Sequence, residues 1–216
     1  EDQFGKRPPL PLRVQAMTAE RRLYQAALAL AQERVNGWKI IRSEEKFEKE
    51  LDGLIIKGRI DCVEKNTKTG AVRVLDFKSS NTAKPPAQLH WKRMPREFDG
   101  DSVRPYARFE VDGKAQHWIG LQLPLYAWAV EAEFGSDVAV GFFNLPAIGT
   151  DTGVSLLEPF DAHVQTAALE CARGVDGDLR AQRFWPAMDR VQYDDFEGIL
   201  FGQPERTASN PGKAVA

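Results

Sequence analysis

The sequence predicts an α/β protein with a mixed central β-sheet flanked by helices, and three observations favour this class. Two runs rich in β-branched residues, 54–64 and 71–78, are joined by the turn-forming stretch 66–70. With residues 38–48 they predict a three-stranded meander. Helical periodicity covers 18–36, 119–134 and 161–173, and two further strand-like runs, 138–145 and 154–158, precede the last helix.

Length and composition favour one domain. The chain has 216 residues, of which 43% are hydrophobic, which is enough to bury a single core. We expect an extended lead-in over 1–17, a domain over 18–202 and a flexible tail over 203–216. Residues 81–118 lose periodicity and predict a basic and aromatic insertion within the domain.

The net charge and the two cysteines argue against several classes of protein. The net charge is −2 and the pI is near 6.0, so the chain lacks the global basic character of an architectural nucleic-acid binder. Cys62 and Cys171 are far apart and predict neither a disulfide framework nor a zinc site. A reducing, cytoplasmic setting fits, and no apolar run is long enough to predict a membrane partner.

The hairpin formed by 54–64 and 71–78 brings two acids together. Pairing across the turn at 66–70 places Asp61 opposite or beside Asp76, and two-residue alternation puts Lys78 on the same face as Asp76. Facing β-carbons lie about 4.5 to 5.5 Å apart. A bound cation such as Mg²⁺ would compensate the repulsion between the two carboxylates.

The same spacing allows a plainer interpretation. The charges of the hairpin could face water, with Lys78 neutralising Asp76, and a slip of one residue in the register would separate the acids. Spacing alone leaves both interpretations open.

The order of three short motifs resembles the PD-(D/E)xK nuclease superfamily, specifically its RecB-type exonuclease branch. The motifs are G-R-I-D ending at Asp61, D-F-K from Asp76, and Q-L-P-L-Y from Gln122 to Tyr126, and the resemblance covers about 38–135. It implies a restriction-endonuclease-like core. It also implies that Asp61, Asp76 and the backbone carbonyl of Phe77 hold Mg²⁺ or Mn²⁺, and that Lys78, Gln122 and Tyr126 complete the catalytic group.

The first helix adds a further candidate ligand. With Thr18 as its N-cap, Leu23 and Tyr24 lie on the apolar face, and Glu20 falls in the middle of that face and points inward. The resemblance implies that an acid of this helix completes the metal site, a role for which Glu20 is suited. The alternative is a solvated acid that interacts favourably with the helix dipole. Glu45 is expected near the site without being a ligand.

The insertion combines cations with aromatic residues, a composition that suits contact with phosphates and unpaired bases. His90 and His117 also lie here and are expected to be incidental. The candidate DNA-binding residues are Lys84, Trp91, Lys92, Arg93, Arg96, Arg104 and Arg108.

Taken together, the residues and the resemblance predict a Mg²⁺- or Mn²⁺-dependent deoxyribonuclease, an exonuclease acting in DNA repair or recombination. DNA is the expected partner, with a helicase domain or subunit if the chain is a fragment. The cysteines that hold an iron–sulfur cluster in many such nucleases are missing, so no cluster is expected. Two alternatives remain: an inactive nuclease-like module that binds DNA or acts as a scaffold in a repair complex, and a hydrolase of small phosphate substrates.

Overall fold

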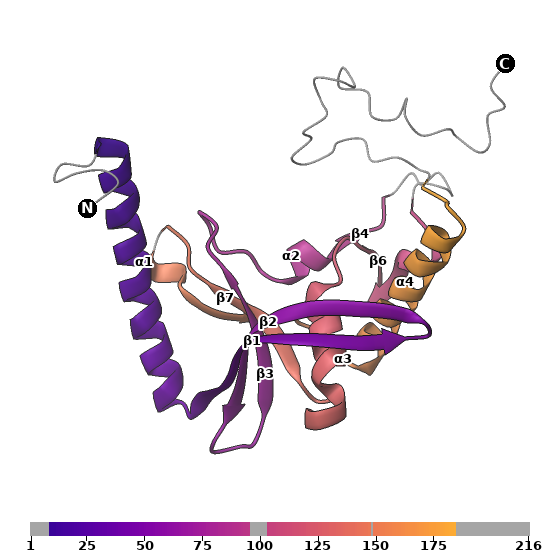
Figure 1. Cartoon of the computed structure of the whole chain (residues 1–216), viewed down its shortest axis with the longest axis horizontal. Helices are drawn as coiled ribbons and strands as arrows, with labels where there is room; N and C mark the ends of the chain where they lie inside the picture. The colour runs from indigo at the N-terminus through magenta and orange to yellow at the C-terminus, as the bar shows by residue number, and fades with distance from the viewer. Residues whose placement is uncertain (1–8, 96–102, 148, 185–216) are drawn as a thin grey trace.

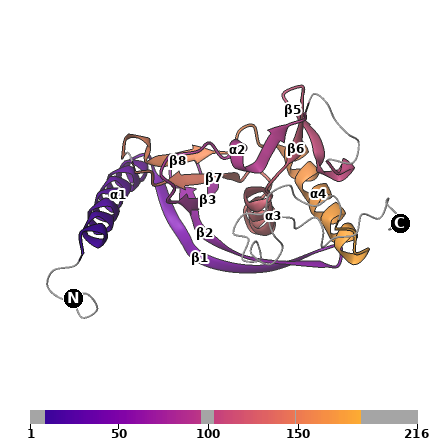
Figure 2. The ribbon, with the colours of Figure 1, turned by 90° about the horizontal axis from the view of Figure 1, so that it is seen from above.

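The computed structural model describes residues 9–95, 103–147 and 149–184. Its centre is a five-stranded sheet in the order β1-β2-β3-β7-β8, and a second sheet has the order β4-β6-β5. Figures 1 and 2 show helix α1 and the second sheet at opposite ends of the central sheet. The strands of the central sheet are β1 (Trp38–Leu51), β2 (Leu54–Asn66), β3 (Val72–Lys78), β7 (Ala139–Asn144) and β8 (Gly153–Leu156).

The central sheet confirms the predicted fold class. Strands β1, β2 and β3 form an antiparallel meander, β3 pairs with β7 in parallel, and β7 pairs with β8 antiparallel. The sheet is therefore mixed. Helices α1 (Leu10–Val35), α3 (Gln122–Phe134) and α4 (Ala162–Arg180) flank it, and Asp161 caps α4 by accepting the Val164 N–H at 2.9 Å.

Helix α1 begins earlier than predicted. It starts at Leu10 rather than Thr18, so residues 10–17 are helical and not an extended lead-in. Pro11 lies in the first turn, where its missing N–H costs nothing. Thr18 bonds to the Val14 carbonyl inside the helix at 2.8 Å instead of capping it.

The predicted inner face of α1 is wrong. Leu23 and Tyr24 are exposed at 66% and 62%, whereas Ala26 is the residue of α1 that the sheet buries. Polar side chains of the same helix reach inward: Glu33 meets the buried Arg73 at 2.5 Å, and Arg22 donates to the Ser79 carbonyl at 2.8 Å. Ala26, Ala29 and Leu30 pack on this side of the sheet, and the ion pair of Glu33 with Arg73 adds to the contact. Glu20 is exposed, so the prediction that it points inward is also wrong.

The described parts of the insertion, 81–95 and 103–118, hold more regular structure than their composition predicts. They contain α2 (Ala87–His90) and the second sheet, made of β4 (Trp91–Arg93), β5 (Arg108–Val111) and β6 (Lys114–Trp118). A turn at Asp112-Gly113 joins β5 to β6, and both residues have positive φ. A short 3₁₀ helix, Pro105–Ala107, contacts α4.

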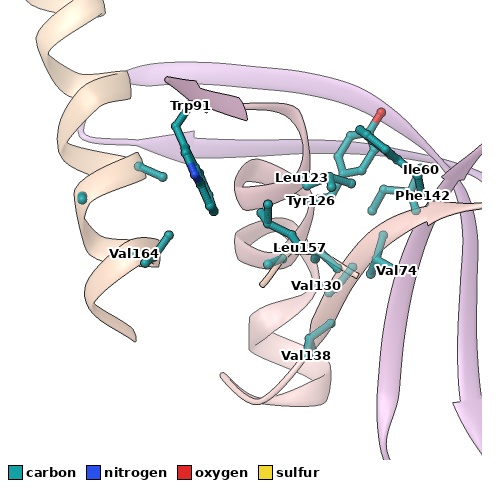
Figure 3. Packing of buried hydrophobic residues seen from close by; sticks show 14 of the residues in the cluster. Ile60, Val74, Trp91, Leu123, Tyr126, Val130, Val138, Phe142, Leu157 and Val164 are labelled. Atoms are coloured by element: carbon teal, nitrogen blue, oxygen red, sulfur yellow. The ribbon is translucent and has the colours of Figure 1, made fainter. Parts of the chain in front are cut away.

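The main core lies between the central sheet, α3 and α4. Figure 3 shows Ile60, Tyr126 and Phe142 grouped where β2, α3 and β7 meet. A second small cluster on the α1 side contains Cys62, which is buried and free. None of the described helices is long and apolar enough to cross a membrane. The predicted tail 203–216 and the end of the predicted domain at 202 lie outside the described residues.

Candidate active site

The two acids of the hairpin lie at neighbouring points on β2 and β3. The last ladder pair toward the site is Cys62 with Leu75, and Asp61 and Asp76 are the next residue on each strand. The register therefore agrees with the predicted one. Asp61 Oδ2 also accepts the backbone N–H of Phe77 at 2.8 Å, which fixes its carboxylate against β3 beside Asp76.

Lys78 closes the site from the same strand. Its Nζ lies 2.7 Å from Asp76 Oδ2 and 3.1 Å from the Gln122 Oε1 that it bonds. It also lies 5.0 Å from the centre of the Phe142 ring, within range of a cation–π contact. An ammonium has three N–H donors, and Asp76 and Gln122 account for two of them. One donor is left for a water or a phosphate oxygen.

Helix α3 joins the two acid-bearing strands. Gln122 Nε2 donates to Asp76 Oδ1 at 2.8 Å and to the Tyr126 hydroxyl at 3.0 Å. That hydroxyl donates in turn to the Arg59 carbonyl on β2 at 2.7 Å. Because residues four apart share a helix face, one face of α3 holds β3 through Gln122 and β2 through Tyr126.

Gly58, the first residue of the G-R-I-D motif, makes room for an aromatic contact. A β-carbon at this position would lie 2.5 Å from the Phe47 ring, so only glycine lets that ring lie across β2. The Phe47 ring meets the Tyr126 ring edge-on at 6.0 Å. The motif therefore supplies both a carboxylate and the close packing that supports Tyr126. The sequence did not single out Phe47, whose partner in register is Gly58.

The electrostatics of Asp76 differ from those of an ordinary surface acid. Asp76 is 5% exposed, and burial raises the pKa of its carboxyl group. Lys78 and the Gln122 amide lower this pKa in part, and the charge of Asp61 raises it again. Burial also raises the pKa of Tyr126, the hydrogen bond to Gln122 opposes this, and the charges of Asp76 and Asp61 raise it further. The two carboxylates thus act on each other and on the same hydroxyl.

The residues fit a divalent cation, which the resemblance to PD-(D/E)xK nucleases implies. Asp76 Oδ2 is buried, and within the described residues its one polar contact is Lys78 Nζ at 2.7 Å, which leaves it able to accept a further ligand. A buried carboxylate oxygen of this kind, next to a second carboxylate, suits a hard cation. The set is small: within the described ranges, no three His, Cys, Asp or Glu side chains gather as a metal cluster. Glu20 is not brought to Asp61 and Asp76.

The predicted DNA-binding residues fall into three groups. Lys84, Lys92 and Arg93 are exposed. Trp91 is buried, with its ring 5.5 Å from that of Trp118, so the prediction that it stacks on a base is wrong. Arg104 pairs with Asp178 at 3.1 Å and Arg108 bonds the Val103 carbonyl at 2.6 Å, which gives both a structural role. Arg96 lies outside the described residues.

His90, which the sequence analysis treated as incidental, is fixed by hydrogen bonds. His90 is 2% exposed and bonds at both ring nitrogens, to the Pro86 carbonyl and to the Leu123 N–H at the start of α3. His117 is partly exposed, and its Nδ1 is buried with no hydrogen-bond partner among the described residues. No signal in the sequence separates the two histidines, because the partners of His90 are backbone groups.

The fold and the site define a nuclease-type α/β protein, in which adjacent strands carry two carboxylates and a lysine. The family model for the PD-(D/E)XK nuclease superfamily matches residues 2–199, and the chain belongs to this superfamily. No curated protein matches. The chain is similar in structure to a candidate exonuclease from Eubacterium rectale, with 12% identity and a TM-score of 0.47. The match covers 93% of this chain and 63% of that one, so the chain spans less than two thirds of that protein's length.

Proposed function

We propose that the chain is a Mg²⁺- or Mn²⁺-dependent deoxyribonuclease that hydrolyses phosphodiester bonds in DNA, of the RecB-type exonuclease branch. The observation that carries the proposal is the junction of Asp61, Asp76 and Lys78, with Gln122 bridging Asp76 and Lys78. Membership in the nuclease superfamily supports hydrolysis of a phosphodiester. A role in repair or recombination, alongside a helicase domain or subunit, belongs to the same proposal.

The chain's own residues divide the work. Asp61, Asp76 and the Phe77 carbonyl would hold the cation, which would supply an activated water and neutralise charge on the phosphate. Lys78 directs its remaining N–H toward the attacking water or the developing negative charge. Gln122 keeps the Lys78 ammonium and the Asp76 carboxylate in their relative positions.

The exposed cations of the insertion provide the DNA contact in this proposal. Lys84 precedes α2, and Lys92 and Arg93 lie on β4, in the segment that follows the catalytic strand. Phosphate contacts of this kind raise affinity without reading sequence and weaken as salt rises.

The test is cleavage of linear and circular DNA, single- and double-stranded, with and without Mg²⁺ or Mn²⁺. Wild-type protein is compared with Asp76→Ala and Lys78→Ala, and with Asp137→Ala and Lys65→Ala as matched exposed controls. Cleavage should need the cation, be lost in the first two variants and persist in the controls. Cleavage that survives both site substitutions would overturn the proposal. Preference for free ends over circles supports an exonuclease.

A second candidate function has one observation in its favour. The part of the chain that the structure describes offers two acids at the site and no third, which fits a nuclease-like module that binds DNA without cutting it. DNA binding that persists at wild-type strength, with no cleavage in Mg²⁺ or Mn²⁺, would favour that candidate.

A further inference from the structure

Helix α3 begins without a cap of its own. Its N-cap residue is Leu121, whose side chain cannot accept a hydrogen bond, although the first backbone N–H groups of a helix have no partner within it. One of these groups, the N–H of Leu123, donates to His90 Nε2 at 3.2 Å. A side chain more than thirty residues earlier therefore replaces the local cap.

The second ring nitrogen fixes the tautomer. His90 Nδ1 lies 2.8 Å from the Pro86 carbonyl oxygen, which can only accept, so Nδ1 carries the proton and Nε2 has the free lone pair. That is the form that can receive the Leu123 N–H. The ring is held at both ends and lies 5.7 Å from the Phe142 ring.

The backbone of His90 contacts the same junction. Its carbonyl accepts the N–H groups of Ile119, at 2.8 Å, and Gly120, at 3.2 Å. A β-carbon on Gly120 would lie 2.7 Å from the Leu89 carbonyl oxygen, so the two chain segments touch here. His90 thus holds the last residues before α3 as well as its first turn.

The residue next to Leu123 is Gln122, whose amide joins Asp76 to Lys78. We propose that His90 is a positioning residue of the active site: it accepts the Leu123 N–H, sets where α3 begins, and thereby holds Gln122 between Asp76 and Lys78. The expected effect on the rate of DNA cleavage rests on the proposed function, whereas the placement of Gln122 by His90 does not.

The surroundings of His90 favour the neutral ring. Burial lowers its pKa most, the Pro86 bond opposes this, and the positive charge of Lys78 on β3 lowers the pKa further. Within the described residues, the groups in contact with the ring from the other elements are uncharged: the Leu123 N–H from α3 and the Phe142 ring from β7. Protonation would place a hydrogen on Nε2 and remove the acceptor that α3 uses.

Two substitutions separate the functions of the ring nitrogens. Glutamine places its amide oxygen at about the reach of Nε2, so His90→Gln can still accept the Leu123 N–H. Asparagine reaches only as far as Nδ1, so His90→Asn can keep the Pro86 contact but loses the α3 contact. His117→Gln is the matched control, because His117 is partly exposed and makes no such bond through Nδ1.

The kinetic measurement is kcat and KM for DNA cleavage across pH. His90→Asn should lower kcat by about 10- to 100-fold with little change in KM, because small misplacements of catalytic groups have effects of this size. His90→Gln should retain most of kcat and lose the part of the acid decline that His90 causes, which lies at more acidic pH than an ordinary histidine would give because burial lowers the pKa of His90. His117→Gln should behave as wild type. Equal kcat in His90→Asn and wild type would overturn the proposal.

The second measurement does not depend on activity. NMR of the histidine nitrogens and of the Gln122 side-chain amide should show Nε2 unprotonated in wild type and Gln122 resonances that shift in His90→Asn but not in His90→Gln. Unmoved Gln122 resonances in both variants would overturn the proposal. Wild-type protein that cuts no DNA, while the Gln122 resonances move as expected, would sink the proposed nuclease function and leave the positioning role supported.

Discussion

The Gln122 amide lies between the two groups of β3 that define the candidate site, donating to Asp76 Oδ1 at 2.8 Å and accepting from Lys78 Nζ at 3.1 Å. The buried Asp76 carboxylate and the half-buried Lys78 ammonium are thus held in place by one neutral amide, whose N–H donates to the first and whose oxygen accepts from the second. Removing the amide would leave Asp76 Oδ1 without its donor and would release the Lys78 ammonium, which lies 2.7 Å from Asp76 Oδ2, from its second partner.

Gln122→Ala is therefore expected to lower kcat by about 10- to 100-fold, because catalytic groups displaced by an ångström lose this much. Binding of DNA, which depends on phosphate contacts elsewhere, should change little. Steady-state cleavage assays and filter binding of DNA give the two quantities. Gln32→Ala, on the exposed part of α1, is the control and should match wild type. Unchanged kcat in Gln122→Ala would contradict the role given to the bridge.

Tyr126→Phe isolates the bond between α3 and β2. The substitution keeps the ring that Phe47 contacts and removes the hydroxyl that donates to the Arg59 carbonyl at 2.7 Å. We expect the free energy of unfolding to fall by about 1 kcal/mol, the usual net value of such a bond. Urea unfolding measures this. The same variant should cut DNA more slowly, because Arg59 lies two residues before Asp61; full activity with reduced stability would limit Tyr126 to a structural role.

Gly58→Ala tests the close packing behind the G-R-I-D motif. The added β-carbon would lie 2.5 Å from the Phe47 ring, so the ring or β2 must move. Overpacking of this kind costs about 1–3 kcal/mol of unfolding free energy. Gly177→Ala in α4 is the matched control, since nothing lies within 4 Å of its added carbon and alanine favours a helix. Thermal or urea unfolding should show the two variants changing in opposite directions.

The raised pKa of Tyr106 predicts that the free energy of unfolding falls at alkaline pH. Burial raises its pKa most, and the hydrogen bond to Asp178 contributes, so the pKa moves from 10.0 to about 12. A raised folded pKa means that the stabilisation is complete below pH 10 and is lost as the pH rises from 10 through about 12. Urea unfolding of wild type should therefore weaken over this range. Tyr106→Phe should lack that part of the decline; identical pH profiles would contradict the prediction.

The sequence predicted the meander and the site hairpin well because both depend on local information. Alternation on β2 and β3, together with a turn of fixed length at 66–70, determines that Asp61 and Asp76 meet. The motif order added Gln122 and Tyr126, which the structure places against those strands. Helical periodicity from 161 also predicted α4, and Asp161 caps it in the structure.

The failures share a physical cause, which is that the decisive partners are distant in sequence. Helix α1 has apolar residues on several sides, and the choice of inner face depends on Arg73 and Glu64, which form a buried ion pair only once the sheet exists. The sequence left Trp91 available for stacking on a base because its partners, Trp118 and Phe109, belong to the second sheet. The strands of that sheet are too short to be predicted from alternation. His90 bonds to backbone groups, which every residue has.

The central claim is that Asp61 and Asp76 hold a divalent cation, and calorimetric titration of Mn²⁺ tests it most directly. Wild-type protein should bind Mn²⁺ with heat that saturates at a fixed ratio, and binding should be lost in Asp61→Asn and Asp76→Asn but retained in Asp137→Asn. Binding that is equal in wild type and both site variants would contradict the account, because the cation would then lie elsewhere.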